Sequence, residues 1–165
     1  MAVLVAVMFF AKPAALWEFD EILFAHATQH FDPATHHPPP PGYPVFIFVA
    51  QLVRHLTPAD FAALVTINFV ASAIGFVLLA LAFDVAGALL FYLSPAMLVH
   101  STLAMSEPGA IALLAVALYF AKRSPVLFGA FAALTVGWRP QFAIFVVPLV
   151  LTCSYTTLRR TSSSG

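Results

Sequence analysis

Long apolar runs, separated by short polar or proline-containing breaks, make up most of the chain. Most breaks contain an X-Pro pair, and such a pair disfavours helix at the residue before the proline. The pattern predicts an all-α, polytopic transmembrane helical bundle of about six membrane segments, since a crossing takes about 20 apolar residues, or fewer where a helix is broken. The apolar runs lie at 1–17, 43–54, 60–83, 85–105, 109–121, 125–138 and 141–158.

One polar stretch, Trp17–Pro44, interrupts this pattern. From about Glu18 to Phe31 its apolar positions recur at helical spacing, which predicts an amphipathic helix lying in the membrane interface. The apolar stripe consists of Phe19, Ile22, Leu23, Phe24, Ala27 and Phe31. The run HHPPPPGYP follows and predicts polyproline II backbone and then a turn at Gly42.

The two ends of the chain set the remaining boundaries. No basic n-region of a signal peptide precedes the first apolar run, so 1–17 is predicted to be a membrane helix, interrupted at Lys12-Pro13. The final segment 159–165, RRTSSSG, is polar and is predicted to be disordered. Residues 1–158 are therefore expected to form a single transmembrane module with its main polar loop at 17–44.

Composition also indicates a membrane protein. The chain is 62% hydrophobic and 8% charged, whereas an ordinary soluble domain is about 25% charged. The formal net charge is zero, so no basic face predicts binding to nucleic acid. Cys153 is the single cysteine and cannot form an internal disulfide.

The charged residues predict a topology if the loop at 17–44 lies outside the cytoplasm. Segment 43–54 then runs inward to Arg54, and segment 60–83 returns outward from Asp60. This scheme puts five of the seven basic residues inside and six of the seven acidic residues outside, Asp60 being the exception.

The same scheme leaves Asp84 and Glu107 on one side of the membrane, although an apolar run joins them. We therefore expect 85–105 to be a re-entrant pair of helices broken at Ser94-Pro95, which is tolerated where protein covers the freed backbone groups. The alternative is that 85–105 crosses once and that 43–83 is arranged differently.

Asp20 and Glu21 are the first candidates for catalysis. Adjacent helical residues point about 100° apart, so we expect one acid to face the site and the other to support it. Apolar neighbours raise the pKa of a carboxylate, which suits a general base. The alternative is that both acids only stabilise the positive N-terminal end of the helix.

Histidines in the same stretch are candidates for metal or substrate binding. His26 and His30 are four residues apart on one helix face, a spacing that can hold zinc or manganese. Histidines in a wet loop more often form hydrogen bonds, so we predict neither a bound metal nor another cofactor, with a divalent metal as the alternative. His37, directly before Pro38, is a candidate for substrate contact.

Three residues beyond the loop are candidates for substrate binding. Glu107 lies between two apolar runs, where an ionisable residue is functional by default, but it also fits a helix start. His100 is expected either to approach Glu107 or to be buried with a hydrogen bond. Arg139 can pair with the acids or clamp a phosphate, or it is an interfacial arginine beside Trp138. Gln141 is a weaker candidate.

These motifs occur in an order that resembles the GT-C glycosyltransferases. The resemblance is to the protein O-mannosyltransferases that use dolichyl-phosphate-mannose, and to their bacterial relatives. It spans residues 10–150 and rests on FDEILF at 19–24, HPPPPGYP at 37–44, LSPAMLVHSTLAMSEP at 93–108 and GWRPQ at 137–141.

The resemblance implies inverting transfer of a sugar from a polyprenyl-phosphate donor, within membrane lipid, to an unspecified acceptor. It implies a multi-pass protein of the plasma (inner) membrane whose active face is extracytoplasmic. Asp20 would be the catalytic base, Glu21 its neighbour in the site, Glu107 the second acidic position and Arg139 a phosphate contact. Members of the family are longer, so we expect the chain to be the N-terminal portion of such an enzyme.

Two other functions also fit the sequence. A small transporter, or a metal or proton carrier, would use the acids and the His26/His30 pair, but it needs acids along a path through the membrane. The acids are instead predicted at one face. A non-catalytic membrane scaffold would require none of these residues.

Overall fold

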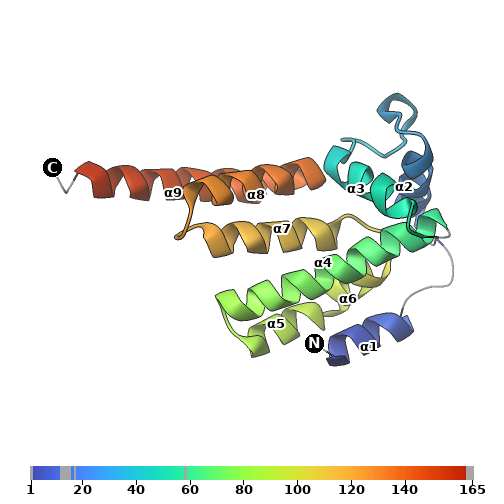
Figure 1. Ribbon diagram of the computed structural model, residues 1–165, viewed down its shortest axis with the longest axis horizontal. Helices are drawn as coiled ribbons and strands as arrows, with labels where there is room; N and C mark the ends of the chain where they lie inside the picture. The colour runs from blue at the N-terminus through green and yellow to red at the C-terminus, as the bar shows by residue number, and fades with distance from the viewer. Residues whose placement is uncertain (1, 12–15, 17, 58, 163–165) are drawn as a thin grey trace.

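The computed structural model describes residues 2–11, 16, 18–57 and 59–162, and the regular elements of these residues are helices (Figure 1). The predicted all-α fold is therefore confirmed for this part of the chain. The elements are α1 (Ala2–Ala11), α2 (Phe19–Gln29), η1 (Pro33–Thr35), α3 (Pro44–Arg54), α4 (Asp60–Ala82), α5 (Val85–Tyr92), α6 (Pro95–Thr102), α7 (Glu107–Phe120), α8 (Pro125–Trp138), η2 (Pro140–Phe142) and α9 (Ala143–Ser162).

The helices α4 and α7 lie side by side in the middle of the molecule and run in the same direction (Figure 1). α8 packs against α7, and the short helices α5 and α6 pack against α4. α2 and α3 cover one end of the bundle, called here the loop end because it carries residues 18–44. Several helices begin at the predicted proline breaks, where the Ser94 and Ser124 hydroxyls cap α6 and α8.

An aromatic cluster attaches the loop end to the bundle. The Phe24 ring lies edge-on to the rings of Tyr43 and Phe46, with centroids 5.0 and 5.1 Å apart. Phe46 in turn lies 5.3 Å from Trp138. These four side chains are buried, so α2, the start of α3 and the end of α8 share one core.

The buried face of α2 differs from the predicted apolar stripe. Phe24 and Ala27 are buried as expected, but Glu21 is also completely buried. The exposed members of the stripe are Phe19 (71%), Ile22 (40%) and Phe31 (43%). The stripe was chosen by hydrophobicity alone and so omitted Glu21, whose carboxylate accepts backbone N–H groups inside the protein.

The proline-rich segment does not form the continuous polyproline II backbone that the sequence predicted. The His37–Pro38 and Pro40–Pro41 peptide bonds are cis, and the Gly42 N–H donates to the Pro39 carbonyl over 3.0 Å to close a turn. Gly42 has a φ of 109°, which a side chain disfavours, so the predicted turn at this glycine is confirmed.

The predicted separation of Arg54 and Asp60 from the polar loop is wrong. Arg54 forms an ion pair with Asp60 at 2.5 Å and donates to the Thr28 carbonyl on α2. Gln29, also on α2, donates to Asp60 over 2.6 Å. α3 has 11 residues and is therefore only about 16 Å long, so it packs along α2 and brings both charges back to the loop end.

Segment 85–105 also departs from the preferred prediction. α5 and α6 are bent by 69° at the Ser94-Pro95 break. Together they travel back along α4, because the Ser72 and Ser101 hydroxyls are hydrogen-bonded at 3.0 Å and Leu103 contacts Asn68. The segment therefore does not return to the Asp84 end. It runs once along the bundle, and 43–83 is arranged differently from the preferred prediction, as in the alternative given above.

By length and apolar composition, α4 is the one described helix that could cross a membrane by itself, and the bent pair α5–α6 could form a second span. α7 and α8 have 14 residues each, which corresponds to about 21 Å.

α1 ends at Ala11, and the predicted break at Lys12-Pro13 lies outside the described residues, as does Trp17. α9 continues to Ser162 and so includes residues 159–162 of the segment predicted to be disordered, while 163–165 lie outside the described residues.

Because α7 packs closely on α8, we predict that alanine substitutions at two glycines will have different effects on stability. A Cβ atom on Gly109 would lie 2.3 Å from the Trp138 ring, whereas one on Gly129 would meet nothing within 4 Å. We expect Gly109→Ala to destabilise the protein by about 1–3 kcal/mol through overpacking. Gly129→Ala, the matched control, should leave the midpoint of thermal unfolding in detergent unchanged or higher. Equal midpoints for both variants would contradict the packing of Trp138 on α7.

Candidate functional site

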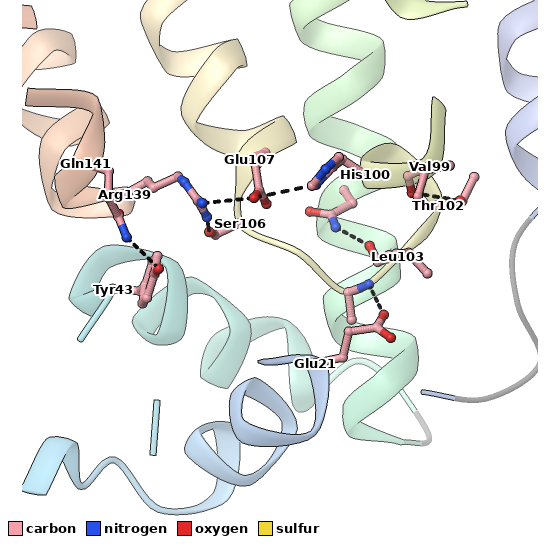
Figure 2. A network of polar contacts seen from close by, with 12 residues as sticks. Glu21, Tyr43, Val99, His100, Thr102, Leu103, Ser106, Glu107, Arg139 and Gln141 are labelled. Atoms are coloured by element: carbon pink, nitrogen blue, oxygen red, sulfur yellow. Dashed lines mark hydrogen bonds and ion pairs between the residues drawn. The ribbon is translucent and has the colours of Figure 1, made fainter. Parts of the chain in front are cut away.

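The connection between α6 and α7, residues 103–106, is held by side chains from three other helices, and Figure 2 shows its contact with Glu21 of α2. The Asn68 amide of α4 donates to the Leu103 carbonyl over 2.5 Å. The Ala104 N–H donates to Glu21 Oε1 over 2.5 Å, and the Trp138 indole N–H donates to the Ser106 carbonyl over 2.9 Å. This connection, called here the α6–α7 loop, is therefore the point where α2, α4 and α8 meet.

Asp20 and Glu21 take different environments, as their adjacency predicts. Glu21 is fully buried, and its second oxygen accepts the Glu18 N–H over 2.9 Å. Its carboxylate satisfies backbone donors and thereby fixes α2 on the α6–α7 loop. Asp20 is half-buried, and its side chain makes no hydrogen bond or ion pair with another described residue.

Glu107 and Arg139 form an ion pair beside the α6–α7 loop, with Arg139 Nη2 at 2.9 Å from Glu107 Oε1. Arg139 Nη1 also donates to the Ser106 hydroxyl over 2.6 Å. The two side chains are only 20% and 18% exposed. The expectation that Arg139 pairs with an acid is thus confirmed, and the pair fixes the end of α8 to the start of α7.

His100 completes this cluster from α6 (Figure 2). Its Nδ1 atom lies 3.5 Å from Glu107 Oε1, close enough for an ion pair when the imidazole is protonated. Glu107 Oε2 and His100 Nδ1 are buried and have no hydrogen-bond partner among the described residues. Buried polar atoms without partners are rare and costly, so the cluster has hydrogen-bonding capacity left for a ligand.

Gln141 and Tyr43 border the cluster on its loop side. The Gln141 amide donates to the Tyr43 hydroxyl over 2.9 Å. The Arg139 guanidinium carbon lies 5.6 Å from the centre of the Tyr43 ring, within the range of a cation–π contact. The end of the proline-rich segment is thereby attached to the same arginine as Glu107. Tyr43 was not singled out from the sequence, although its place at the end of HPPPPGYP offered a signal.

In the loop end, His26 does not pair with His30, as the metal hypothesis required. The His26 ring stacks on His37, with centroids 5.1 Å apart and planes inclined by 18°, while His30 is exposed. Within the described ranges, no three His, Cys, Asp or Glu side chains converge as a metal site. His37 is half-buried, and its predicted contact with substrate stays a prediction.

Backbone hydrogen bonds in both directions between Asp32 and His37 close the turn that carries η1. The Thr35 hydroxyl lowers the pKa of Asp32, and the Ala34 N–H adds to this effect. A carboxyl whose pKa is lowered in the folded state stabilises that state while it is ionised. We therefore expect this turn to loosen as the pH falls through the pKa of Asp32.

An apolar groove of about 620 Å³ lies along α7, and its lining on this helix begins at Ile111, one turn after Glu107. Ile111, Leu114 and Leu118 line it and follow Glu107 at helical spacings of four, three and four residues. Phe91 of α5 and Phe142, three residues after Arg139, also line the groove. A smaller apolar groove of about 360 Å³ lies between α3, α4, α7 and α8 and is lined by Gly109 and Ala112, which face away from Glu107.

No protein-family model, curated protein or solved structure matches this chain.

The ion pair gives a testable coupling between Glu107 and Arg139. Arg139→Leu should leave the Glu107 charge without its partner and lower stability by about 2–3 kcal/mol, less than in a fully buried pair because both groups are partly exposed. Adding Glu107→Gln should restore part of the loss, which thermal unfolding of the four proteins in a double-mutant cycle measures. Strictly additive losses would contradict a direct interaction.

Proposed function

We propose that this protein is a membrane glycosyltransferase of the GT-C type. It transfers a sugar, with inversion, from a polyprenyl-phosphate donor to an acceptor outside the cytoplasm. The supporting observation is a charged cluster, made by His100, Glu107 and Arg139, whose Glu107 lies one helical turn before Ile111 of an apolar groove of about 620 Å³. That volume is within the range of about 300–1,000 Å³ typical of ligand pockets.

The arrangement suits a ligand with a phosphate on a long apolar chain. The groove residues would contact the polyprenyl chain, and the cluster would contact the phosphate at its head. Arg139 retains unused N–H donors, since Nη1 and Nη2 each carry two hydrogens and one bond is formed by each. A small transporter is less well supported, because Glu21 and Glu107 both lie beside the α6–α7 loop instead of along a path through the bundle.

The loop end would face the outside of the cell. Lys122 and Arg123 lie between α7 and α8 at the opposite end of the bundle (Figure 1), and basic residues favour the cytoplasmic side. Asp84 lies there as well, while Arg54 and Asp60 lie at the loop end. The proposed orientation is thus the predicted one, with Asp84 in place of Asp60 as the acid on the inside.

Asp20 would act as the base. Its carboxylate would take the proton of the acceptor hydroxyl while the hydroxyl oxygen forms a bond to the anomeric carbon. The bond from that carbon to the phosphate oxygen breaks on the opposite face, and the polyprenyl phosphate leaves with the electron pair. Positive charge at Arg139 would stabilise the negative charge that this phosphate gains.

Photo-crosslinking tests the proposal without requiring turnover. An undecaprenyl phosphate analogue with a diazirine in its chain should label peptides that contain Phe91, Ile111 or Phe142 in the detergent-purified protein. Excess undecaprenyl phosphate should prevent the labelling, whereas undecaprenol, which lacks the phosphate, should not. Labelling that undecaprenol removes equally well, or that falls outside the groove, would argue against a lipid-phosphate donor.

A further inference from the structure

We infer that His100 supplies the positive charge that receives the donor's phosphate, with Nδ1 against Glu107 and Nε2–H directed at a phosphate oxygen. The inference rests on the proposed function, because it assigns a residue to the donor's phosphate in the same site. His100 lies within the motif at 93–108, but the resemblance gives it no role. Its assignment comes from the geometry around Glu107.

The accessible edge of the imidazole is the edge that carries Nε2. The His100 side chain is 36% exposed, although its Nδ1 atom is buried. Nε2 lies away from the carboxylate and is not among the buried unpartnered atoms, so we assign it to the exposed part of the side chain. An imidazole whose Nδ1–H points at a carboxylate keeps a fixed orientation and presents Nε2 to a ligand.

The net charge of the cluster, and with it the attraction for an anion, depends on whether His100 is protonated. Glu107 and Arg139 neutralise each other in their ion pair, so the cluster is neutral when His100 is neutral and carries one positive charge when His100 is protonated. A charge-assisted hydrogen bond to phosphate is about twice as strong as a neutral one. Affinity for a phosphate should therefore follow the protonation of His100.

The surroundings of His100 offer few competing charges. α7 contributes Glu107, with Arg139 of the α8–η2 junction behind it. α4 contributes the uncharged Asn68 and Ser72, and its acid Asp60 is paired with Arg54. α5 contributes the neutral Tyr92, whose hydroxyl lies beside Gly75, and the described α1 side chains, residues 6–11, are apolar. Among the described residues, the charged groups that face His100 are thus Glu107 and, behind it, Arg139.

The test measures binding of a polyprenyl methyl phosphodiester, whose single negative charge is constant between pH 5.5 and 8.5. In phosphatidylcholine vesicles, the wild-type protein should bind it about tenfold more tightly at pH 5.5 than at pH 8.5. His100→Gln should bind at pH 5.5 as weakly as the wild type at pH 8.5. His100→Lys, which keeps the charge, should bind tightly at both pH values.

His36→Gln is the matched control, because His36 is an exposed histidine of the loop and its loss should leave the pH dependence intact. Inorganic phosphate and phosphatidylglycerol should displace the probe weakly, and equal displacement by either would overturn the assignment to a polyprenyl ligand. If the wild type binds the probe with no pH dependence, or if His100→Gln keeps that dependence, the role of His100 is refuted, while the proposed function is not. If the wild type does not bind the probe at either pH, the proposed function fails as well.

Discussion

Asp20→Asn is expected to lower the rate of sugar transfer by about 10²–10⁴-fold, the usual contribution of a general base. The amide has nearly the shape of the carboxylate but cannot accept the proton of the acceptor hydroxyl. The Asp20 side chain makes no hydrogen bond or ion pair with the other described residues, so we expect their packing to be unchanged in Asp20→Asn. The release of polyprenyl phosphate from a radiolabelled donor panel measures the rate.

Two observations would remove Asp20 from the role of base. The first is an Asp20→Asn protein that releases polyprenyl phosphate at the wild-type rate. The second is a loss of rate that accompanies an equal loss of thermal stability, because the effect would then be structural. Asp32→Asn provides the comparison, since it changes an acid of the same loop that lies in a turn of its own.

Glu21→Ala is expected to have the opposite phenotype, a loss of stability of about 2–4 kcal/mol. The substitution leaves the buried Ala104 N–H without its acceptor and removes the bond from the Glu18 N–H. It also releases α2 from the α6–α7 loop, to which Trp138 and Arg139 are attached. For a domain of this size the midpoint of thermal unfolding should fall by about 5–15 °C.

Glu21→Gln separates geometry from charge at this position. The glutamine amide retains one acceptor oxygen, so it should keep the bond to Ala104 and lose less than half of the stability that Glu21→Ala loses. Asp20→Asn in the same unfolding experiment should stay close to the wild type. If Glu21→Ala unfolds at the wild-type temperature, Glu21 does not anchor the α6–α7 loop.

The helical architecture follows from local sequence. Apolar runs and X-Pro breaks predicted the starts of α6, α7 and α8, because proline restricts the backbone of its neighbours wherever it occurs. The turn at Gly42 is similarly local, since its φ of 109° suits glycine best. Candidate residues for the site were also visible, because ionisable side chains are scarce in an apolar chain.

Topology was harder to predict, because the charge rule assumes that each apolar run crosses the membrane. α3 packs along α2, and α5–α6 travels once along α4. The Arg54–Asp60 pair, bonded to Gln29, depends on this packing and was assigned to the wrong end of the bundle. Short helices can turn back where neighbouring helices satisfy their ends, and a single sequence does not contain that information.

By itself, the sequence determined that the chain is helical and apolar and that its titratable groups gather around residues 18–44. Only the tertiary structure decided which of those groups meet. Asp20 and Glu21 are chemically alike and adjacent, yet Glu21 is buried against Ala104 and Asp20 is not. The difference arises because residues 83 positions apart bring a backbone N–H to one carboxylate, and a buried donor requires an acceptor. The same long-range packing brings His100 and Arg139 to Glu107.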